Sequence, residues 1–486
     1  MDKSIKEKYQ PVIGLEIHAQ LSTASKIFAP DSTEFGSLPN TNVSVITLAH
    51  PGTLPLLNKK VVEYSIKMGL ACGCEINRVS FFDRKNYFYP DLPKGYQTTQ
   101  DKAPICKGGG VLIRTKEGEK VIRLNRIHME DDAGKNLHLA EETDTLVDYN
   151  RAGVPLIEIV TEPDIRSSEE AFQVVTEIRK LVRYLEVCDG NMEEGSMRCD
   201  ANVSVMLKGA TQFGKKVEIK NMNSIRNVQR AIDHEIERQI ELLERGETIF
   251  SETRMFDATT GSTYSMRTKE ELNDYRYFPE PDLQPLHISD KWLADIQATM
   301  PSLPNFLYKK FTSEFGLPEY DAQVLTDSKE IALYFEELCK YTKNYKAASN
   351  WVMGPVKGYL NELTLHIKDF PLTAQKLAEL IALVESGKVS FAVASQKLFP
   401  EMLKQKGGSA QEIAEKMNLI QESDTSALQP LIDEVIAKYP NKVAEYKGGK
   451  TNLLAMFMGE VMKLTKGKAD PRITSELLKK TLENQN

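Results

Sequence analysis

Alternating hydrophobic and polar positions mark strands in the first part of the chain, from about residue 12 to residue 286. In VIGLEIHAQL, residues 12–21, apolar side chains occupy every second position, and Glu16 and His18 fall between them. This period of two places the apolar side chains on one face of a strand and the polar ones on the other. Three further segments read as strands: 154–160, 198–207 and 215–221. We therefore expect a sheet with a buried face.

Two segments in the same part of the chain have the period of an amphipathic helix instead. Residues 167–187 begin with a serine cap and early glutamates, and apolar residues recur at positions 171, 174, 178, 181 and 185. Residues 223–246 repeat apolar side chains at positions 225, 228, 232 and 236 and end at Gly246. Runs of strands with segregated helices predict an α+β domain with a largely antiparallel sheet.

Helical spacing replaces the strand pattern from about residue 296 onward. Four segments have it: 328–341, 347–363, 373–387 and 411–420. The paired glycines of KQKGGSAQ, residues 404–411, mark a boundary between amphipathic helices. We therefore predict a β-rich domain over residues 1–295, a helical domain over 296–406 and a small helical tail domain over 407–486.

Composition agrees with a chain of several folded domains. Its 486 residues, 41% hydrophobic and 27% charged, exceed what one ordinary core holds. No apolar run approaches the roughly 18–20 residues of a membrane helix, and the charged N-terminus is followed by no signal-like apolar stretch. We expect a cytoplasmic protein without membrane contact. The net charge of −7 counts weakly against a protein that mainly coats nucleic acid.

Six cysteines in so long a chain do not make a disulfide scaffold. Cys72 and Cys74 could form half of a zinc site, with Cys188, Cys199 or distant histidines as partners. Structural zinc sites usually have two closely spaced ligand pairs, and this sequence has no second tight pair. Buried, reduced thiols are therefore the favoured interpretation, and zinc at Cys72 and Cys74 stays open.

Carboxylates stand where strands should be apolar or neutral. They are Glu16 with His18 on one face, Glu158, Glu218, and the run Glu130, Asp131 and Asp132. Burying a carboxylate is costly unless a cation or hydrogen bonds compensate it. An outward-facing residue on a one-sided sheet explains a single case, and a shared cation is the alternative for several. Oxygen ligands with one imidazole suit Mg²⁺ or Mn²⁺ better than zinc.

Magnesium usually accompanies phosphate, which makes a nucleotide the natural co-substrate. However, GGKT at residues 448–451 lacks the upstream glycine of a P-loop because that position is Ala444, and GGG at 108–110 fits no dinucleotide fingerprint. Neither G-x-S-x-G nor a catalytic cysteine signature appears. An ATP site in this chain would therefore be of an unusual kind.

Lysines gather in the last part of the chain with few acids among them: Lys442, Lys447, Lys450, Lys463, Lys466 and Lys468. The solvated face of a helix pair would explain them. We favour contact with nucleic acid, because lysines clustered around a Gly-rich turn can bind phosphates.

Long motifs then point to a family. They are VIGLEIHAQL, DRKNYFYPDLPKGYQTTQ, IHMEDDAGK, DYNRAGVPLIEIVTEPDI, EEGSMRCDANVSV, EIKNMNSIRNVQRAIDHEIERQ and DYRYFPEPDLQPL. In this order they resemble the B subunits of the tRNA-dependent aspartyl/glutamyl amidotransferases, and the resemblance runs from about residue 11 to the end of the chain. It implies a cradle-shaped β-rich domain, a helical domain and a helical tail that grips tRNA.

The resemblance also implies a reaction. Glu-tRNA(Gln) or Asp-tRNA(Asn) would be converted to the correct amide, after ATP and Mg²⁺ are used to phosphorylate the side-chain carboxylate of the esterified amino acid. Ammonia would come through an internal channel from an amidase partner, the A subunit, and a small C subunit would complete a heterotrimer. A non-catalytic tRNA-binding scaffold and a metal-dependent nuclease are the alternatives.

Matching positions assign the site. Metal contacts are expected from Glu16, His18, Glu130, Asp131, Glu158 and Glu218, and tRNA contacts from Lys447, Lys450, Lys463, Lys466 and Lys468. Asp131 stands where relatives can have glutamate, so its shorter side chain makes ligation by Glu130 the stronger expectation. Glu130, Lys135 and Arg151 are the expected catalytic residues. Lys135 and Arg151 would stabilise phosphate charge, Lys135 as the ATP contact.

Overall fold

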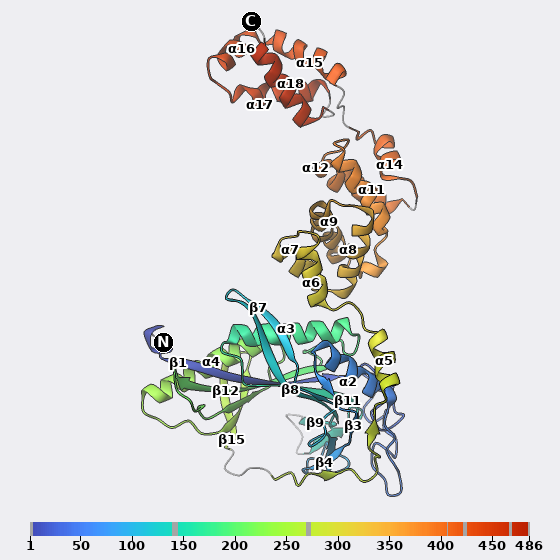
Figure 1. Cartoon of the computed structure of the whole chain (residues 1–486), viewed down its shortest axis with the longest axis vertical. Helices are drawn as coiled ribbons and strands as arrows, with labels where there is room; N and C mark the ends of the chain where they lie inside the picture. The colour runs from blue at the N-terminus through green and yellow to red at the C-terminus, as the bar shows by residue number, and fades with distance from the viewer. Residues whose placement is uncertain are drawn as a thin grey trace. The chain divides into compact units, whose positions relative to one another are not determined.

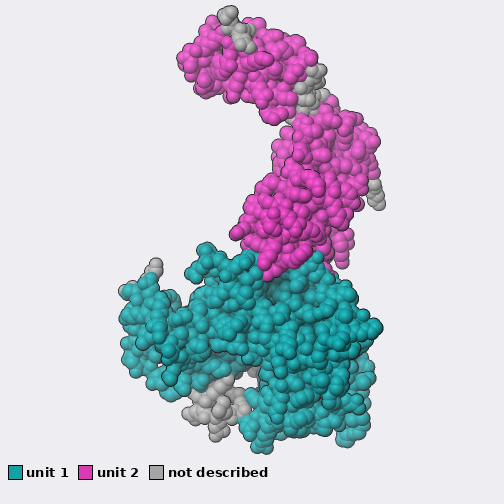
Figure 2. Space-filling view, in the orientation of Figure 1, with its two compact units in different colours: residues 1–304 teal, residues 305–486 magenta. Residues whose placement is uncertain are grey.

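The computed structural model describes residues 3–138, 144–268, 274–405, 407–420, 425–465 and 469–484. The chain forms two units, residues 1–304 and residues 305–486 (Figure 2). The first unit contains the sheet and the second is helical. The α+β class, with a β-rich part followed by a helical part, is thereby confirmed. The three-part division of the chain stays a prediction.

A ten-stranded mixed sheet forms the centre of the described part of the first unit (Figure 1). From one edge to the other its strands are β15 (Ser262–Thr268), β14 (Glu252–Asp257), β13 (Val217–Lys220), β12 (Met197–Leu207), β1 (Tyr9–Gln20), β11 (Pro155–Thr161), β8 (Gly118–Asp131), β6 (Cys106–Lys107) and β2 (Glu75–Ile76), and β7 (Gly110–Thr115) pairs with β8 beside this path. Neighbouring strands run antiparallel except β13 and β14, which are parallel. The predicted, largely antiparallel sheet is confirmed.

Two long helices, α3 (Ser168–Tyr184) and α4 (Ile225–Glu244), cover one face of this sheet (Figure 1). Beneath them, Ile13, Leu15 and Ile17 of β1 are almost completely buried and belong to the main apolar core. The alternation predicted for residues 12–21 is therefore correct, because β1 turns every second side chain toward the helices.

Serine caps begin both helices. Ser167 accepts a hydrogen bond from the backbone N–H of Glu170, and Ser224 accepts one from Asn227. These bonds satisfy amides that would otherwise lack a partner at the helix start. The serine cap expected for the first helix is thus present.

The rest of the described part of this unit consists of short helices and strands. They are α1 (Lys3–Lys6), α2 (Lys59–Ala71), β3 (Val79–Ser80), β4 (Asp83–Asn86), β5 (Tyr96–Thr99), β9 (Lys135–His138), β10 (Thr145–Asp148), β16 (Phe278–Pro279), β17 (Leu286–His287) and α5 (Asp290–Ala298). Of these, β4 pairs with β5 and β16, and β5 lies against β8. Residues on β5 therefore come close to the end of β8, where the predicted acidic run lies.

The second unit contains helices throughout its described part. They are α6 (Pro304–Ser313), α7 (Glu319–Leu325), α8 (Lys329–Tyr341), α9 (Tyr345–Trp351), α10 (Lys357–Glu362), α11 (Ala374–Glu385), α12 (Phe391–Val393), α13 (Phe399–Lys404), α14 (Ala410–Lys416), α15 (Thr425–Lys438), α16 (Pro440–Lys447), α17 (Leu453–Leu464) and α18 (Pro471–Asn484), with π-helical turns at Val352–Val356 and Ala394–Leu398 and a 3₁₀ turn at Ile367–Asp369. No helix among the described residues is long and apolar enough to cross a membrane.

One predicted helix is interrupted. The pattern over residues 347–363 predicts a single helix, and the chain instead passes from α9 through the π-helical turn to α10. Pro355 lies inside that turn. Proline has no N–H to donate and crowds the preceding turn, which accounts for the local change of helical geometry.

The last four helices have an apolar core of their own. Its buried residues include Leu428 and Ile432 of α15, Phe457 and Val461 of α17, and Leu478 of α18. Helices too short to be stable in isolation gain their stability from such packing. The segment from residue 425 to 484 is thereby held together by contacts among its own helices.

Candidate functional site

Four strands place charged side chains in one row on the face of the sheet opposite α3 and α4. His18 of β1 lies opposite Arg198 of β12 on one side and Glu158 of β11 on the other, and Glu158 lies opposite His128 of β8. Directly opposed residues on neighbouring strands share a face of the sheet. Glu130, two residues beyond His128, lies on the same face.

His18, His128, Glu130 and Glu158 form what we call the His–Glu cluster. The Nε2 atom of His18 is 3.3 Å from Glu130 Oε1 and 3.7 Å from Glu158 Oε2. The Nε2 atom of His128 is 3.1 Å from Glu158 Oε2 and 3.7 Å from Glu130 Oε2. Each carboxylate therefore lies within ion-pair distance of both imidazoles.

Protonation of this cluster is strongly perturbed. Burial opposes the charged form of His18, but a hydrogen bond to Glu130 and the charges of Glu158 and Glu130 outweigh it and raise the pKa of His18 to about 9. Burial likewise opposes ionisation of Glu130, yet the two histidines hold its pKa well below the ordinary value, and the pKa of Glu158 is lowered in the same way. The cluster is thus a place where positive charge is stabilised between carboxylates.

The donor atoms also fit a divalent cation. One ligand atom each from His18, Glu130 and Glu158 lies within 4.8 Å of the others. His128 adds a second imidazole, and its Nδ1 atom is buried without a hydrogen-bond partner. Carboxylates suit Mg²⁺ and Mn²⁺, and imidazole ligands move the preference of the set toward Mn²⁺ and Zn²⁺. A cation here would compete with the proton of His18.

His18, Glu130 and Glu158 of the cluster line a cavity of about 590 Å³, which we call the large cavity. Its carboxylates are Glu16, Glu130, Asp132, Glu158, Asp200 and Glu218, and its lysine and arginine residues are Lys85, Arg198 and Lys220. Protonated His18 adds a fourth cation, Arg198 pairs with Asp132 at 3.0 Å, and Lys220 pairs with Asp200 at 2.5 Å and with Glu218 at 3.0 Å. The six acids still exceed these cations, and the excess favours a ligand that brings cations, since burying uncompensated negative charge is costly.

Glu16 and Glu218 lie beside the cluster in this cavity. Burial and the nearby charges of Glu158, Glu218 and Asp200 raise the pKa of Glu16, although the Asn202 side chain donates a 2.9 Å hydrogen bond to it. Glu218 accepts a hydrogen bond of 2.9 Å from the Thr253 hydroxyl. Five of the six predicted metal residues, all except Asp131, therefore line one cavity.

Asp131 is directed elsewhere. Its carboxylate pairs with Lys94 at 2.5 Å and accepts the backbone N–H of Thr98 at 2.8 Å. Together with these residues it lines a second cavity of about 330 Å³. Because successive residues of a strand point to opposite sides, Asp131 turns away when Glu130 turns toward the cluster.

Lys135 and Arg151 line neither cavity. The Arg151 guanidinium donates hydrogen bonds of 2.9 and 2.6 Å to the carbonyl oxygens of Ala133 and Gly134 and lies 3.7 Å from Asp132. It therefore stabilises the turn that follows β8. Lys135 begins β9 with an exposed side chain. Their catalytic roles stay predictions.

The predicted tRNA contacts lie in the last helices. Lys450 pairs with Glu445 at 3.1 Å, and Lys463 pairs with Glu460 at 2.5 Å. Both lysines are largely exposed, and exposed ion pairs contribute little, so these pairs leave the side chains accessible to phosphate. Lys447 ends α16. Lys466 and Lys468 lie outside the described residues.

Sequence reasoning missed His128, Arg198, Asp200 and Lys220. The signal for His128 was its spacing, because it precedes Glu130 by two residues on a strand and so shares its face. Arg198 and Asp200 alternate with apolar residues in the predicted strand 198–207 in the same way. None of these positions indicates by itself which strands lie next to one another.

The two cysteines considered for zinc are buried in the apolar core of the first unit. Burial raises the pKa of Cys74 to about 12 and that of Cys72 still further. A thiol must lose its proton to bind zinc. Among the described residues, the grouping of possible metal ligands contains no cysteine.

Comparison with known proteins gives matches along the whole chain. A family model described as GatB/GatE catalytic domain matches residues 11–294, and one described as GatB domain matches residues 333–482. The protein of Trichodesmium erythraeum that is named as the B subunit of aspartyl/glutamyl-tRNA(Asn/Gln) amidotransferase is 50% identical, over 99% of this chain and 99% of the relative. A protein of the same name from Geotalea uraniireducens is 51% identical, over 98% of this chain and 99% of the relative.

Proposed function

The chain belongs to the family of aspartyl/glutamyl-tRNA(Asn/Gln) amidotransferase B subunits, and we propose that it carries the site at which misacylated tRNA is amidated. Glutamate on tRNA(Gln), aspartate on tRNA(Asn) or both would be converted to the amide in an ATP-dependent reaction. The observation that supports this most directly is the His–Glu cluster on the wall of the large cavity, with its surplus of carboxylates.

The reaction explains why such a site is needed. A side-chain carboxylate resists attack by ammonia because oxide would have to leave. When a carboxylate oxygen attacks the γ-phosphorus of ATP, the bond to ADP breaks and an acyl phosphate forms. Ammonia then attacks the carbonyl carbon, inorganic phosphate leaves, and the nitrogen loses a proton to give the amide. Phosphoryl transfer of this kind depends mainly on alignment and charge neutralisation.

His18, Glu130 and Glu158 would hold a divalent cation, with His128 beside them and Glu16 and Glu218 in the lining of the same cavity. Such a cation supplies the charge neutralisation that ATP requires among six carboxylates. Mg²⁺ is the expected ion, since it accompanies ATP. The protein's part is to fix these side chains on adjacent strands, where the sheet holds each at a set distance from the next.

Cationic side chains of the same cavity would bind the phosphates. Lys85, Arg198 and Lys220 line it, and each can offer N–H donors to phosphate oxygens. Lys135 and Arg151 were expected in this role from the sequence, and for them it stays a prediction. We favour the three cavity-lining residues because they lie on the same cavity wall as the His–Glu cluster.

The names of the relatives describe them as subunits, so this chain works within a multi-subunit enzyme. We propose that an amidase partner, the A subunit, releases ammonia from glutamine, that a small C subunit completes the heterotrimer, and that the complex acts in the cytoplasm, where aminoacyl-tRNA is used. The last helices would bind tRNA through Lys447, Lys450, Lys463 and, in sequence, Lys466 and Lys468.

Glu158→Gln tests the site in the reconstituted complex with misacylated tRNA. The substitution keeps the shape of the side chain and removes its charge from the cluster. We expect ATP-dependent amidation to fall by about a hundredfold or more, while release of ammonia from glutamine continues. Glu162→Gln, four residues on and outside both cavities, is the matched control and should retain amidation.

Full amidation and normal ATP use by Glu158→Gln would reject the assignment of the cluster. Loss of amidation together with loss of ATP use would support the assignment. If the chain instead binds tRNA but consumes no ATP in the active complex, it is the non-catalytic scaffold.

The tail is tested separately. The double substitution Lys450→Ala with Lys463→Ala should weaken tRNA binding several-fold and flatten its salt dependence. Unchanged tRNA affinity would reject the role of the tail.

A further inference from the structure

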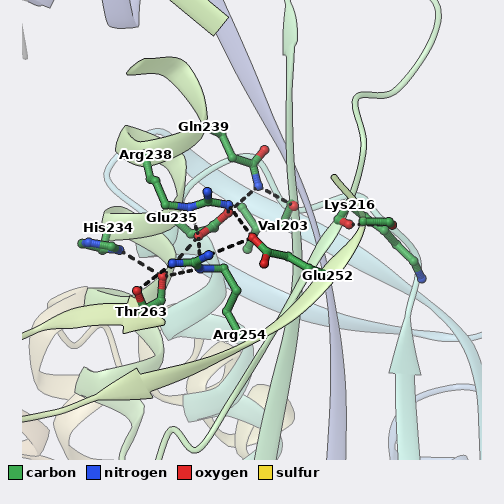
Figure 3. Close-up of polar contacts among 10 residues, drawn as sticks. Val203, Lys216, His234, Glu235, Arg238, Gln239, Glu252, Arg254 and Thr263 are labelled. Carbon is green, nitrogen blue, oxygen red and sulfur yellow. Dashed lines mark hydrogen bonds and ion pairs between the residues drawn. The ribbon is translucent and has the colours of Figure 1, made fainter. Parts of the chain in front are cut away.

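An ionic cluster around the buried Glu235 lies on the helix-covered face of the sheet (Figure 3), and its residues line neither cavity. It joins Glu235, Arg238 and Gln239 of α4 to Glu252 and Arg254 of β14 and to Thr263 of β15. We call it the α4–β14 cluster. None of these residues lines the large cavity, so the proposed function leaves the cluster without a role.

Glu235 is the centre of this cluster and has no exposed surface. Arg238 holds its two oxygens with hydrogen bonds of 2.9 and 2.7 Å, and Gln239 adds one of 2.8 Å. These three residues come from one helix, so they satisfy the carboxylate locally. A fully buried carboxylate needs such partners, because isolated burial costs several kcal/mol.

Arg254 is the residue that connects the helix to the strands. Its guanidinium donates to Glu252 at 2.8 Å and to the Thr263 hydroxyl and carbonyl at 2.8 and 2.7 Å, and its Nε lies 3.7 Å from Glu235 (Figure 3). One side chain thus contacts α4, β14 and β15 together. Two arginines against two glutamates leave this cluster without excess charge.

Thr253, the neighbour of Arg254, faces the large cavity. Adjacent residues of a strand point to opposite faces, so Arg254 enters the α4–β14 cluster and Thr253 donates its hydroxyl to Glu218 at 2.9 Å. In the parallel pairing of β13 with β14, Glu218 lies opposite Thr253 and Ile219 lies opposite Arg254. The position of Glu218 is therefore linked through β14 to α4.

The pairing of β14 is short on one side and irregular on the other. The parallel ladder between β13 and β14 covers three residue pairs, and the register between β14 and β15 shifts between Thr253 and Arg254. The shift leaves Met266 of β15 as the extra residue, and Met266 lines the large cavity. Bulges of this kind re-aim side chains next to functional sites. An additional restraint on β14 at this point has a clear physical purpose.

We infer that Arg254 is a positioning residue for Glu218, because it ties β14 to α4 and so keeps the Thr253 hydroxyl where it orients the Glu218 carboxylate in the large cavity. The inference rests on the proposed function in that Glu218 is taken to contact a cation. Buried ionic groups that fix one register rather than add stability have precedent elsewhere.

Binding of Mn²⁺ to the full-length chain, followed by electron paramagnetic resonance, tests this without ATP or tRNA. Thr253→Val removes the hydroxyl and keeps the shape, and Arg254→Lys keeps the charge and loses the multiple hydrogen bonds. Each should weaken Mn²⁺ binding about tenfold, as loss of a residue that orients a ligand does. Thr253→Ser keeps the hydroxyl and should bind as the unsubstituted chain.

The double variant distinguishes positioning from general damage. If Arg254 acts through Thr253, Arg254→Lys adds little to Thr253→Val, and the pair stays near tenfold. Arg230→Lys is the matched control, since Arg230 also joins α4 to the β14–β15 turn, through the Ala258 carbonyl at 3.3 Å. It should leave Mn²⁺ binding unchanged.

If the double variant binds Mn²⁺ about a hundredfold more weakly, the effects of the two substitutions multiply and the inference is overturned. It is also overturned if Arg254→Lys leaves Mn²⁺ binding unchanged while Glu218→Gln weakens it. In both cases the proposed function survives. Unchanged Mn²⁺ binding and amidation by Glu218→Gln would overturn Glu218 as a cation contact and the inference with it. If Arg254→Lys unfolds, Glu252→Gln tests the same link, because Glu252 accepts the 2.8 Å hydrogen bond from Arg254. It should weaken Mn²⁺ binding about threefold. Unchanged Mn²⁺ binding would contradict the inference.

Discussion

The two faces of the central sheet use charge in opposite ways. Under α3 and α4 the face is apolar, and where charges are buried there, two arginines match two glutamates in the α4–β14 cluster. On the opposite face six carboxylates meet three lysine and arginine residues and the protonated His18 across the large cavity. Both faces are built from alternate residues of the same strands.

The difference separates a structural role from a chemical one. A buried cluster that satisfies its own charges has no need of a ligand and serves to fix the position of elements. A cluster that keeps surplus carboxylates destabilises the fold until a cation arrives, and such arrangements are typical of functional sites. Charge balance, rather than the number of charges, is what distinguishes the two faces.

Adjacent residues of β11 give the largest expected contrast. Ile159 is fully buried in the core, so Ile159→Ala should lower the free energy of unfolding by about 2–5 kcal/mol through lost apolar contact and a residual cavity. Urea unfolding followed by circular dichroism measures this. The folded fraction should retain amidation, because the side chain points away from the cavity.

Ile159→Val is the matched control and should cost about 0.5–1.5 kcal/mol. The contrary result is clear: an Ile159→Ala chain as stable as the original, with amidation lost, would mean that the helix-covered face also carries chemistry. In that event the division between faces would be wrong.

Much of this contrast could be predicted from the sequence. The period of two in residues 12–21 indicated which side chains of β1 face the helices, and the lone Glu158 in an apolar strand indicated a compensated carboxylate. Five of the six predicted metal residues line one cavity. The direction of the β1 side chains was predictable because it depends on the local geometry of a strand, which the sequence pattern determines. That the five cavity-lining residues bind metal stays a prediction.

The rest depends on contacts between distant segments. His18, Glu158 and His128 are neighbours only because β1, β11 and β8 pair in one particular register, and a shift of one residue would turn each side chain to the other face. Asp131 was grouped with Glu130 by sequence, yet Lys94 and Thr98 hold it on another side of β8. Family motifs identify such residues but do not indicate which side of the strand each side chain faces.

A change of pH should sharpen the comparison on the cavity side. Burial opposes the charged form of His18, but Glu130 and Glu158 raise its pKa from 6.5 to about 9. In cation-free buffer the resulting stabilisation is fully present below pH 6.5 and is lost as pH rises through about 9. Thermal unfolding between these values should reveal a loss of at most about 3 kcal/mol.

His18→Asn should flatten this part of the pH profile, because the titrating group is gone. Added Mn²⁺ should also flatten it and release a proton on binding, since metal and proton compete for the same imidazole. A profile that is unchanged in His18→Asn would show that the positive charge between Glu130 and Glu158 is not the source of the effect.

Glu16→Gln gives the smallest expected change and the sharpest test of surplus charge. Burial and the charges of Glu158, Glu218 and Asp200 raise the pKa of Glu16 above its ordinary 4.5, so its ionised form destabilises the folded chain at neutral pH. Glutamine keeps an acceptor for Asn202 and removes that charge. Without cations, the variant should be more stable by about 0.5–2 kcal/mol in thermal unfolding, and the gain should disappear below about pH 4.5. With Mn²⁺ the order should reverse, because Glu16 is one of the proposed cation contacts. Glu193→Gln, an exposed position in the same unit, should change neither measurement.

If Glu16→Gln is instead destabilised without cations, the carboxylates of the large cavity are as well balanced as those of the α4–β14 cluster, and the difference between the two faces is not one of charge.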